Sequence, residues 1–150
     1  MILGNQEKVL FGPGFIKDDI LGLSFEISAS SFFQVNPVQV EKLYKTALNL
    51  IKPQQKPVIL DAYSGVGTIG LIAARNAKKV ISVEINKDAS RNAIENAKRN
   101  GVENIEFYCD DAGRFINNME GELDIVIMDP PRKGSDEKFL YLHWIDLEEA

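Results

Sequence analysis

The sequence is poor in the residues from which several kinds of site are built. It contains a single cysteine, Cys109, in 150 residues, which excludes an internal disulfide and a cysteine-based metal centre. No stretch approaches 18 consecutive apolar residues, so no membrane span is predicted. The first residues also lack the long apolar core of a secretory signal. We therefore expect a cytoplasmic chain without a metal site.

Basic residues are also in the minority. The 17 Lys and Arg residues stand against 22 Asp and Glu residues, for a formal net charge of -5 at pH 7. This balance does not favour binding of a phosphate backbone across the whole surface. Any contact with nucleic acid must therefore be local, or supplied by another part of a protein. With 45% hydrophobic residues, the chain is long enough for one domain with a real core.

The N-terminal part, residues 1–36, alternates short apolar runs with glycine and proline. This pattern predicts a β-hairpin that turns around Gly12, Pro13 and Gly14, followed by a lead-in to the rest of the domain. A helix is then predicted from Pro37 to near Lys52, because apolar residues recur there at helical spacing behind a capping asparagine, Asn36.

Strands and helices alternate through the central part, residues 37–135. Strands are predicted at 57–63, 78–85, 104–109 and 123–129, with helices at 68–77, 87–101 and 112–119. Such alternation is typical of an α/β domain with a doubly wound parallel sheet. The sheet is short, with four main strands, and residues 136–150 predict one atypical C-terminal helix.

A glycine-rich stretch, ILDAYSGVGTIG at residues 59–70, follows the first of these strands. Each predicted strand of the sheet also ends at a carboxylate, and in an open parallel sheet ligands bind outside these ends. The acidic residues are Asp61, Glu84, the pair Asp110 and Asp111, and Asp129. Two like charges about 5 Å apart at an effective dielectric near 20 repel by roughly 3 kcal/mol, which disfavours a pyrophosphate here. S-adenosyl-L-methionine carries a positive sulfonium and ammonium and no phosphate, so this acidic crevice favours it.

Individual residues suggest roles in binding that cofactor. Gly65 and Gly67 permit a tight turn and close approach of the backbone to a ligand. The cofactor's carboxylate can meet the helix N-terminus beyond Gly67. Glu84 can accept hydrogen bonds from both ribose hydroxyls, and Asp111 is placed to meet the adenine amino group. The simpler alternative is that the glycines only turn a corner and the acids are solvated strand ends.

The fourth strand leads into DPPRKG, residues 129–134. The two prolines fix the backbone beside Asp129, which would suit an acid that holds a substrate base. Amino-group methyltransferases of nucleic acids have an aromatic residue after Asp-Pro-Pro that stacks on a flipped base. Arg132 occupies that position here, so the stacking platform is absent. Arg132 and Lys133 suit a phosphate or a base carbonyl instead.

Taken in order, FFQVNP, LDAYSGVGTIG, VEINKDASRNAIENAKRNG and MDPPRKG resemble the catalytic domain of the RNA uracil-C5 methyltransferases, which make 5-methyluridine in tRNA or 23S rRNA. The resemblance covers residues 5 to 140. It implies a Rossmann-like S-adenosylmethionine-dependent methyltransferase fold, with a C-terminally truncated parallel sheet and an N-terminal β-hairpin, in a protein that acts on RNA. The cofactor contacts that it implies are Gln34, Tyr63, Glu84 and Asp129, with Thr68 and Asp111 as neighbours.

The chain also departs from that family. Its members continue into an SCNP-like segment with a nucleophilic cysteine and later a glutamate base, and neither is present among these residues. Carbon 5 of uracil is a poor nucleophile, so a thiolate must first add at carbon 6 and a base must later remove the proton from carbon 5. Cys109, at the end of a strand among acids, fits an ordinary strand residue better than a nucleophile. We therefore expect these residues alone to bind the cofactor without catalysing transfer.

Three alternatives stay open. The chain could be a non-catalytic dimerisation or regulatory module that self-associates through an exposed sheet edge. It could transfer a methyl group to an amino nitrogen of adenine or cytosine, although Arg132 argues against this. The glycine spacing alone would also suit an NAD-dependent oxidoreductase.

Overall fold

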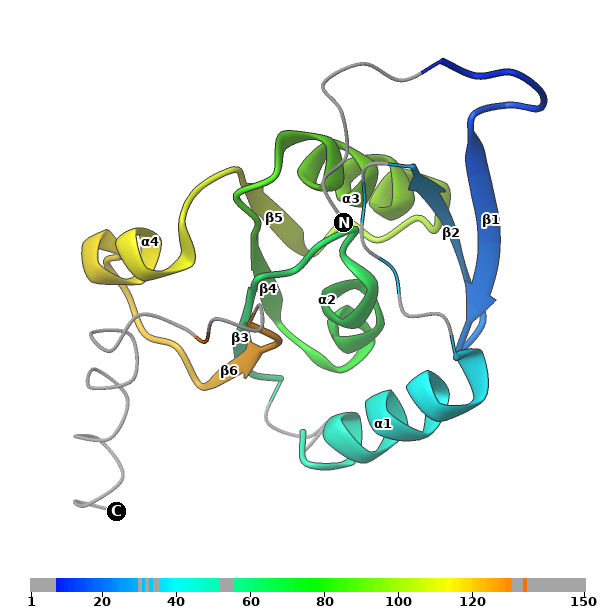
Figure 1. Cartoon of the computed structure of the whole chain (residues 1–150). Helices are drawn as coiled ribbons and strands as arrows, with labels where there is room; N and C mark the ends of the chain where they lie inside the picture. The colour runs from blue at the N-terminus through cyan, green and yellow to red at the C-terminus, as the bar shows by residue number, and fades with distance from the viewer. Residues whose placement is uncertain are drawn as a thin grey trace.

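The computed structural model describes residues 8–29, 31, 33, 36–51, 56–130 and 134. A two-stranded hairpin comes first, followed by a helix and then a four-stranded sheet with its connecting helices. Figure 1 views the sheet nearly edge-on, with α4 on one side and α1, α2, α3 and the hairpin on the other. None of the helices in this described part has the length and apolar character needed to span a bilayer.

The hairpin pairs β1 (Phe15–Ile20) with β2 (Leu23–Ser28) in antiparallel register. Its turn is formed by Leu21 and Gly22, both at positive φ, and not by Gly12, Pro13 and Gly14, which precede β1. The predicted hairpin is confirmed, but its predicted turn was wrong. A two-residue turn with both φ values positive matches the twist of paired strands, whereas the sequence signal of Gly-Pro-Gly is equally satisfied by a bend ahead of a strand.

Helix α1 (Pro37–Asn49) begins as predicted. The Asn36 side chain accepts a hydrogen bond from the Gln39 amide at 3.2 Å, and proline stands at the first helical position. The helix ends three residues before the predicted Lys52. Its buried side chains are Val40 and Tyr44, which face the rest of the domain.

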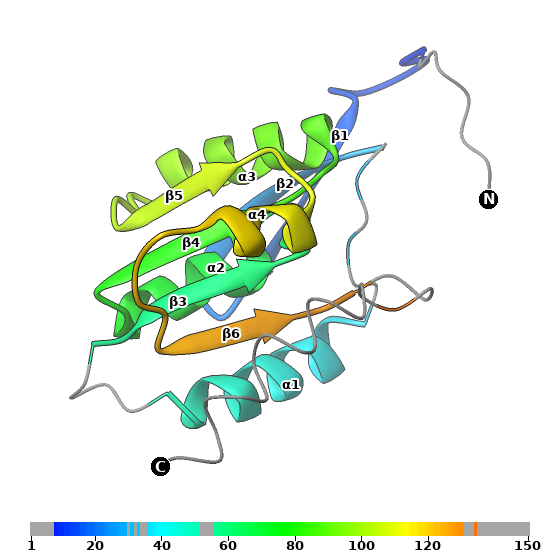
Figure 2. The same cartoon turned by 90° about the vertical axis from the view of Figure 1, so that its left-hand side faces the viewer.

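Four parallel strands form the main sheet, in the spatial order β5-β4-β3-β6. Figure 2 shows their arrows pointing the same way. Their bounds are β3 (Val58–Ala62), β4 (Lys79–Val83), β5 (Ile105–Tyr108) and β6 (Ile125–Met128). The predicted α/β class with a four-stranded parallel sheet is thus confirmed for the described residues.

Helices cover both faces of this sheet. They are α2 (Thr68–Ala73), a 3-10 turn η1 (Ala74–Asn76), α3 (Lys87–Arg99) and α4 (Ala112–Asn118). Alternate residues of each strand point to opposite faces, so Ile59 joins the core under α2 and the hairpin while Leu60 joins a second core under α4.

The strand order fixes where a ligand crevice is expected. From β3 the chain runs outward through β4 to β5, and then returns to place β6 on the other side of β3. Ligands of doubly wound sheets bind at such a reversal, beyond the carboxyl ends of the strands. Here the reversal lies between β3 and β6.

Candidate functional site

A pocket of about 60 Å³ lies at this reversal. It combines two carboxylates with hydroxyl and aromatic groups from β3, the glycine-rich loop, α1, α2 and the end of β6. Its lining residues are Phe33, Tyr44, Asp61, Tyr63, Ser64, Gly65, Val66, Thr68, Ile69 and Asp129. Ligand pockets usually measure about 300–1,000 Å³, so this one suits one end of a ligand whose remainder extends along the strand ends.

Asp61 is the most unusual group in the pocket. It is 1% exposed, and its Oδ2 has no hydrogen-bond partner among the described residues. Burial raises the pKa of this carboxyl from 3.8 to about 7, and repulsion from Asp129 and Glu84 adds to the shift, while the backbone amide of Gly70 opposes it. A buried carboxylate without a partner is costly, which marks this oxygen as a position where a positive group would be stabilised.

The glycine-rich stretch, residues 59–70, brings the backbone close to neighbouring elements at two positions, the N-cap of α2 and a residue within that helix. A Cβ on Gly67, where φ is +82°, would lie 3.0 Å from the Cβ of Ala93 on α3. A Cβ on Gly70 would lie 2.5 Å from Oδ2 of Asp61, closer than Cβ atoms approach in proteins. The third glycine of the stretch is therefore required by the buried carboxylate beneath it.

Glu84, after β4, fixes the same loop from the other side. Its Oε2 accepts a hydrogen bond from the Gly65 amide at 2.8 Å, and its Oε1 accepts one from the Asn86 amide at the same distance. Each carboxylate oxygen keeps a further lone pair for a ligand hydroxyl. The structure therefore brings Glu84 to the loop; its contact with ribose stays a prediction.

Tyr44 and Phe33 line the pocket although the sequence pattern did not single them out as site residues. Burial, together with repulsion from Asp61 and Asp129, raises the pKa of Tyr44 to about 12. Its phenol thus keeps its proton and can donate a hydrogen bond to a carboxylate or a ligand. The sequence signal that could have identified Tyr44 is its position on the apolar stripe of α1, because a buried phenol requires a polar partner.

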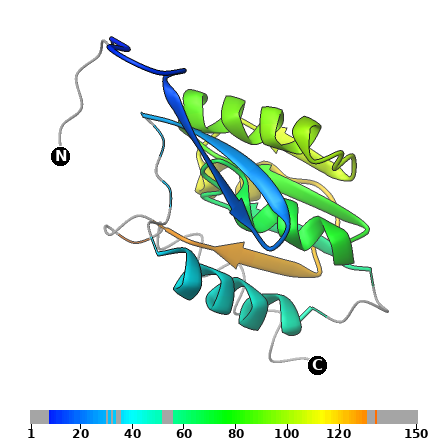
Figure 3. The ribbon, with the colours of Figure 1, turned by 90° about the vertical axis from the view of Figure 1, so that its right-hand side faces the viewer.

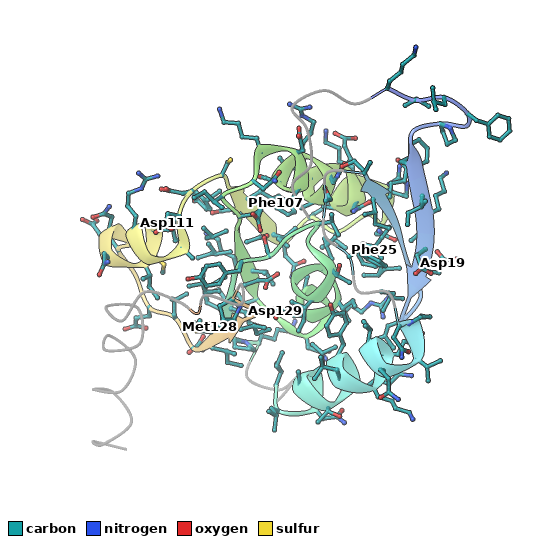
Figure 4. All side chains as sticks on the ribbon, viewed as in Figure 1. Asp19, Phe25, Phe107, Asp111, Met128 and Asp129 are labelled. Carbon is teal, nitrogen blue, oxygen red and sulfur yellow. The ribbon has the colours of Figure 1, made fainter. Side chains whose placement is uncertain are left out.

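Asp110 and Asp111, the two acids after β5, lie outside the pocket. Asp111 caps α4 by accepting a hydrogen bond from the Arg114 amide at 2.9 Å, and Asp110 pairs with the Arg114 guanidinium. Neither residue lines the pocket, and Figure 4 shows Asp111 beside α4 and away from Asp129. The predicted adenine contact of Asp111 stays a prediction.

Cys109 is exposed, and its sulfur lies 3.8 Å from the Ile85 carbonyl oxygen. It follows β5, whereas the pocket lies at β3 and β6. Three strand spacings of about 4.8 Å place the end of β5 about 14 Å from the end of β6. This separation agrees with the interpretation of Cys109 as an ordinary residue at a strand end.

Three predicted site residues, Gln34, Arg132 and Lys133, lie outside the described residues. The others have known positions. Tyr63, Gly65, Thr68 and Asp129 line the pocket, while Gly67 and Glu84 shape the loop that forms its wall.

A larger hollow of about 930 Å³ lies between the segment before β1 and the end of β2. Its described lining is mainly apolar, and the charged residues in it are Lys8 and Asp18. It lacks the convergence of polar groups expected of a small-molecule site, so the smaller pocket at the sheet is the better candidate.

The chemistry of that smaller pocket fits a cation. Among its described lining residues there are two carboxylates, Asp61 and Asp129, and no lysine or arginine. A ligand with a positive centre would stabilise the ionised form of Asp61, whereas a phosphate would be repelled by both acids. The residues therefore fit the ammonium and sulfonium end of S-adenosyl-L-methionine better than a dinucleotide.

Comparison with known proteins agrees with this geometry. A family model described as conserved hypothetical protein 95 matches residues 30–143. An uncharacterized RNA methyltransferase of Lactiplantibacillus plantarum is 44% identical over 143 residues, which make up 93% of this chain and 31% of that protein. Another, of Clostridium acetobutylicum, is 45% identical over 144 residues, with 94% of this chain and 31% of that protein covered. The chain thus spans 31% of the length of these two curated relatives.

One solved structure with the same fold is the tRNA (uracil-54, C5)-methyltransferase of Pyrococcus abyssi, in complex with S-adenosyl-L-homocysteine. It superposes with a TM-score of 0.75 at 31% identity, over 87% of this chain and 32% of that one. The fold of this chain is therefore the Rossmann-like fold of S-adenosylmethionine-dependent methyltransferases.

Proposed function

Since this chain belongs to the conserved hypothetical protein 95 family, we propose that it forms the S-adenosyl-L-methionine-binding part of an RNA (uracil-5-)methyltransferase. Two curated relatives are RNA methyltransferases by name, and the solved neighbour acts on uracil of tRNA. The four motifs set out above, FFQVNP to MDPPRKG, support the same substrate.

The observation that carries the proposal is the buried carboxyl of Asp61 beside Asp129, whose Oδ2 has no hydrogen-bond partner within the part of the chain that the structure describes. The cofactor, when bound, supplies a methyl group on a positively charged sulfur. Its charged end would lie against these two acids, because their negative potential favours a cation. Tyr44 holds its proton at neutral pH and can orient one of the carboxylates by donating to it.

Further cofactor contacts are proposed in the same pocket and at the end of the neighbouring strand β4. Tyr63 and Thr68 line the same pocket, and Glu84 would accept the ribose hydroxyls with the lone pairs that Gly65 and Asn86 leave free. Gln34 and Asp111 complete the set implied by the resemblance to the uracil-C5 enzymes.

RNA is the proposed partner, with Arg132 and Lys133 contacting a phosphate or a base carbonyl. These 150 residues contain no cysteine other than Cys109, which lies at the opposite edge of the sheet from Asp129. A polypeptide of these residues should therefore bind the cofactor and leave uracil unmodified, because no thiolate is placed to activate carbon 5.

Calorimetric titration tests the cofactor. We expect a folded sample to bind S-adenosyl-L-methionine and to give no heat with NAD, and we expect Asp61→Asn to weaken the affinity at least tenfold. Binding of NAD without binding of S-adenosyl-L-methionine would overturn the proposal. Circular dichroism of both proteins establishes that they are folded.

The substrate is tested in a chimera, in which residues 5–140 replace the matching segment of the Lactiplantibacillus plantarum relative. Nucleosides from unmodified tRNA and 23S rRNA incubated with the chimera are analysed by mass spectrometry. We expect 5-methyluridine. A methylated guanine, adenine or cytosine would contradict uracil specificity while leaving RNA methylation intact.

Self-association stays a prediction of its own. In the described sheet, β5 and β6 are edge strands that pair on one side only, and unpaired edges favour pairing with a second chain. Light scattering across a hundredfold range of concentration distinguishes the cases. A monomer throughout would remove the dimerisation alternative.

A further inference from the structure

The hairpin contacts the main domain through an unusual row of asparagines on α3. Asn92, Asn96 and Asn100 are spaced four residues apart, a repeat of about 6 Å along a helix. They face Ser28, Glu26 and Ser24, spaced two residues apart, a repeat of about 6.8 Å along a strand. Figure 3 looks onto the hairpin, and β2 lies along α3 there.

The side-chain amides act as substitutes for a neighbouring strand. The Ser24 amide donates to Oδ1 of Asn100 at 2.9 Å, and Nδ2 of Asn100 donates back to the Ser24 carbonyl at 2.8 Å. The Glu26 amide donates to Oδ1 of Asn96 at 2.8 Å, and Nδ2 of Asn96 donates to the Glu26 carbonyl at 3.1 Å. The backbone groups of Ser24 and Glu26, on the edge of β2 that does not pair with β1, are thereby satisfied.

Asn96 differs from Asn100 in contacting the glycine-rich loop and Arg99. Its Nδ2 also donates to the carbonyl oxygen of Val66 at 3.2 Å, in the middle of the glycine-rich loop. Its Oδ1 accepts a second hydrogen bond from Arg99 at 3.0 Å, and the side chain is fully buried. All four hydrogen-bonding positions of this amide are used, so no other residue type of similar volume can replace it.

We propose that Asn96 is a positioning residue that ties the glycine-rich loop to β2, so that hairpin docking and cofactor binding stabilise each other. The inference rests on the proposed function, because the loop is the wall of the proposed cofactor pocket. Val66 and Gly65 both line that pocket, and Gly65 also donates to Glu84. One buried amide thus contacts two segments 40 residues apart, Glu26 and Val66. Linkage requires that such coupling act in both directions.

The test compares Asn96→Ala with a matched control, Asn100→Ala. Both remove one asparagine amide from α3 and its paired hydrogen bonds to β2, but only Asn96 also contacts the loop. Hydrogen exchange is followed at the amide of Gly67, which donates to the Ser64 carbonyl. We expect Asn96→Ala to accelerate this exchange and to weaken S-adenosyl-L-methionine binding, each at least tenfold. We expect Asn100→Ala to accelerate exchange at Ser24, with cofactor affinity within twofold of the unmodified chain.

Equal effects of the two variants on the loop, or no effect of Asn96→Ala in a folded sample, would overturn the proposal. If Asn96→Ala does not fold, the unmodified chain gives the answer, since bound cofactor should slow exchange at the Glu26 amide at least threefold. Unchanged exchange there with cofactor bound would also overturn it. If the unmodified chain binds no cofactor, the proposed function is contradicted instead. The exchange of the Gly67 amide in the ligand-free variants then still tests whether Asn96 holds the glycine-rich loop on β2.

Discussion

Asp61 and Asp110 both stand at the carboxyl ends of parallel strands, yet their surroundings differ in each respect that sets a pKa. Asp61 is buried under α2 and its Oδ2 has no partner among the described residues, so the pKa of its carboxyl is raised to about 7. Asp110 pairs with Arg114 in solvent, and this hydrogen bond holds the pKa of its carboxyl below the ordinary value. The same residue type, inside the end of β3 in one case and two residues after β5 in the other, thus favours opposite protonation states.

Asp61 is available to interact with a ligand, whereas Asp110 already has a partner of opposite charge. Asp110 has its counter-charge four residues along the chain, at the start of α4. Asp61 has no cation near it among the described residues, and its neighbours Asp129 and Glu84 are acids. Perturbed carboxyls in a crevice are candidates for function, and this comparison identifies Asp61 as the stronger candidate.

The largest expected effect comes from replacing the titratable carboxyl of Asp61. The pKa of Asp61 is raised in the folded chain, so between pH 4 and 7 the folded protein holds a proton that the unfolded chain has released. Its stability therefore falls as the pH rises through this window, by about 4 kcal/mol for a shift of about three units. Asp61→Asn should lack this dependence and should be the more stable protein at pH 8.

Urea unfolding at pH 5 and pH 8 measures that difference. Subtracting the pH dependence of Asp61→Asn from that of the unmodified chain isolates Asp61, because all other titrating groups are shared. Identical pH dependences would show that Asp61 is ionised in the fold and would remove the contrast with Asp110.

Gly70→Ala is expected to have the second-largest effect on stability, and whether it stabilises or destabilises the fold is informative. Alanine inside a helix normally stabilises it relative to glycine, but here the added Cβ would lie 2.5 Å from Oδ2 of Asp61. Overpacking of this kind costs about 1–3 kcal/mol, so we expect a net loss of stability. Thermal unfolding measures it.

The double variant Asp61→Ala with Gly70→Ala completes the cycle. The added Cβ then meets no carboxylate, and the second substitution should cost little or stabilise the helix. A loss of the same size in both backgrounds would mean that Gly70 is required for a reason other than Asp61.

The sequence was sufficient for most of the fold because its signals are local. The alternation of apolar runs and capped helical stretches predicted β3 to β6 and α1 to α4, each confirmed with ends that differ by a few residues. The hairpin turn was misplaced because Gly-Pro-Gly is a strong bend signal by itself, while the turn at Leu21 depends on the pairing of β1 with β2.

The site was only partly predictable. Strand-end acids can be read from the sequence, but which of them is buried depends on contacts with α1 and α2, which bring Tyr44 and Gly70 to Asp61. The row of asparagines is likewise visible as NAIENAKRN. The strand that these asparagines contact cannot be predicted from the sequence, because it lies about 70 residues earlier in the chain, as the hydrogen bond between Asn96 and Glu26 shows.

Asp110→Asn should have the smallest effect and the opposite dependence on pH. Because the folded-state pKa of Asp110 is lowered by Arg114, its contribution is present above pH 4 and is lost as the pH falls through that lowered value. The pair is exposed, and exposed pairs contribute little, so the melting temperature at pH 7 should change by no more than the experimental error. The affinity for S-adenosyl-L-methionine should stay within twofold, since Asp110 does not line the pocket at β3 and β6. A tenfold loss in the same calorimetric titration would place Asp110 at the ligand and extend the acidic site across the sheet to β5, which would end its contrast with Asp61.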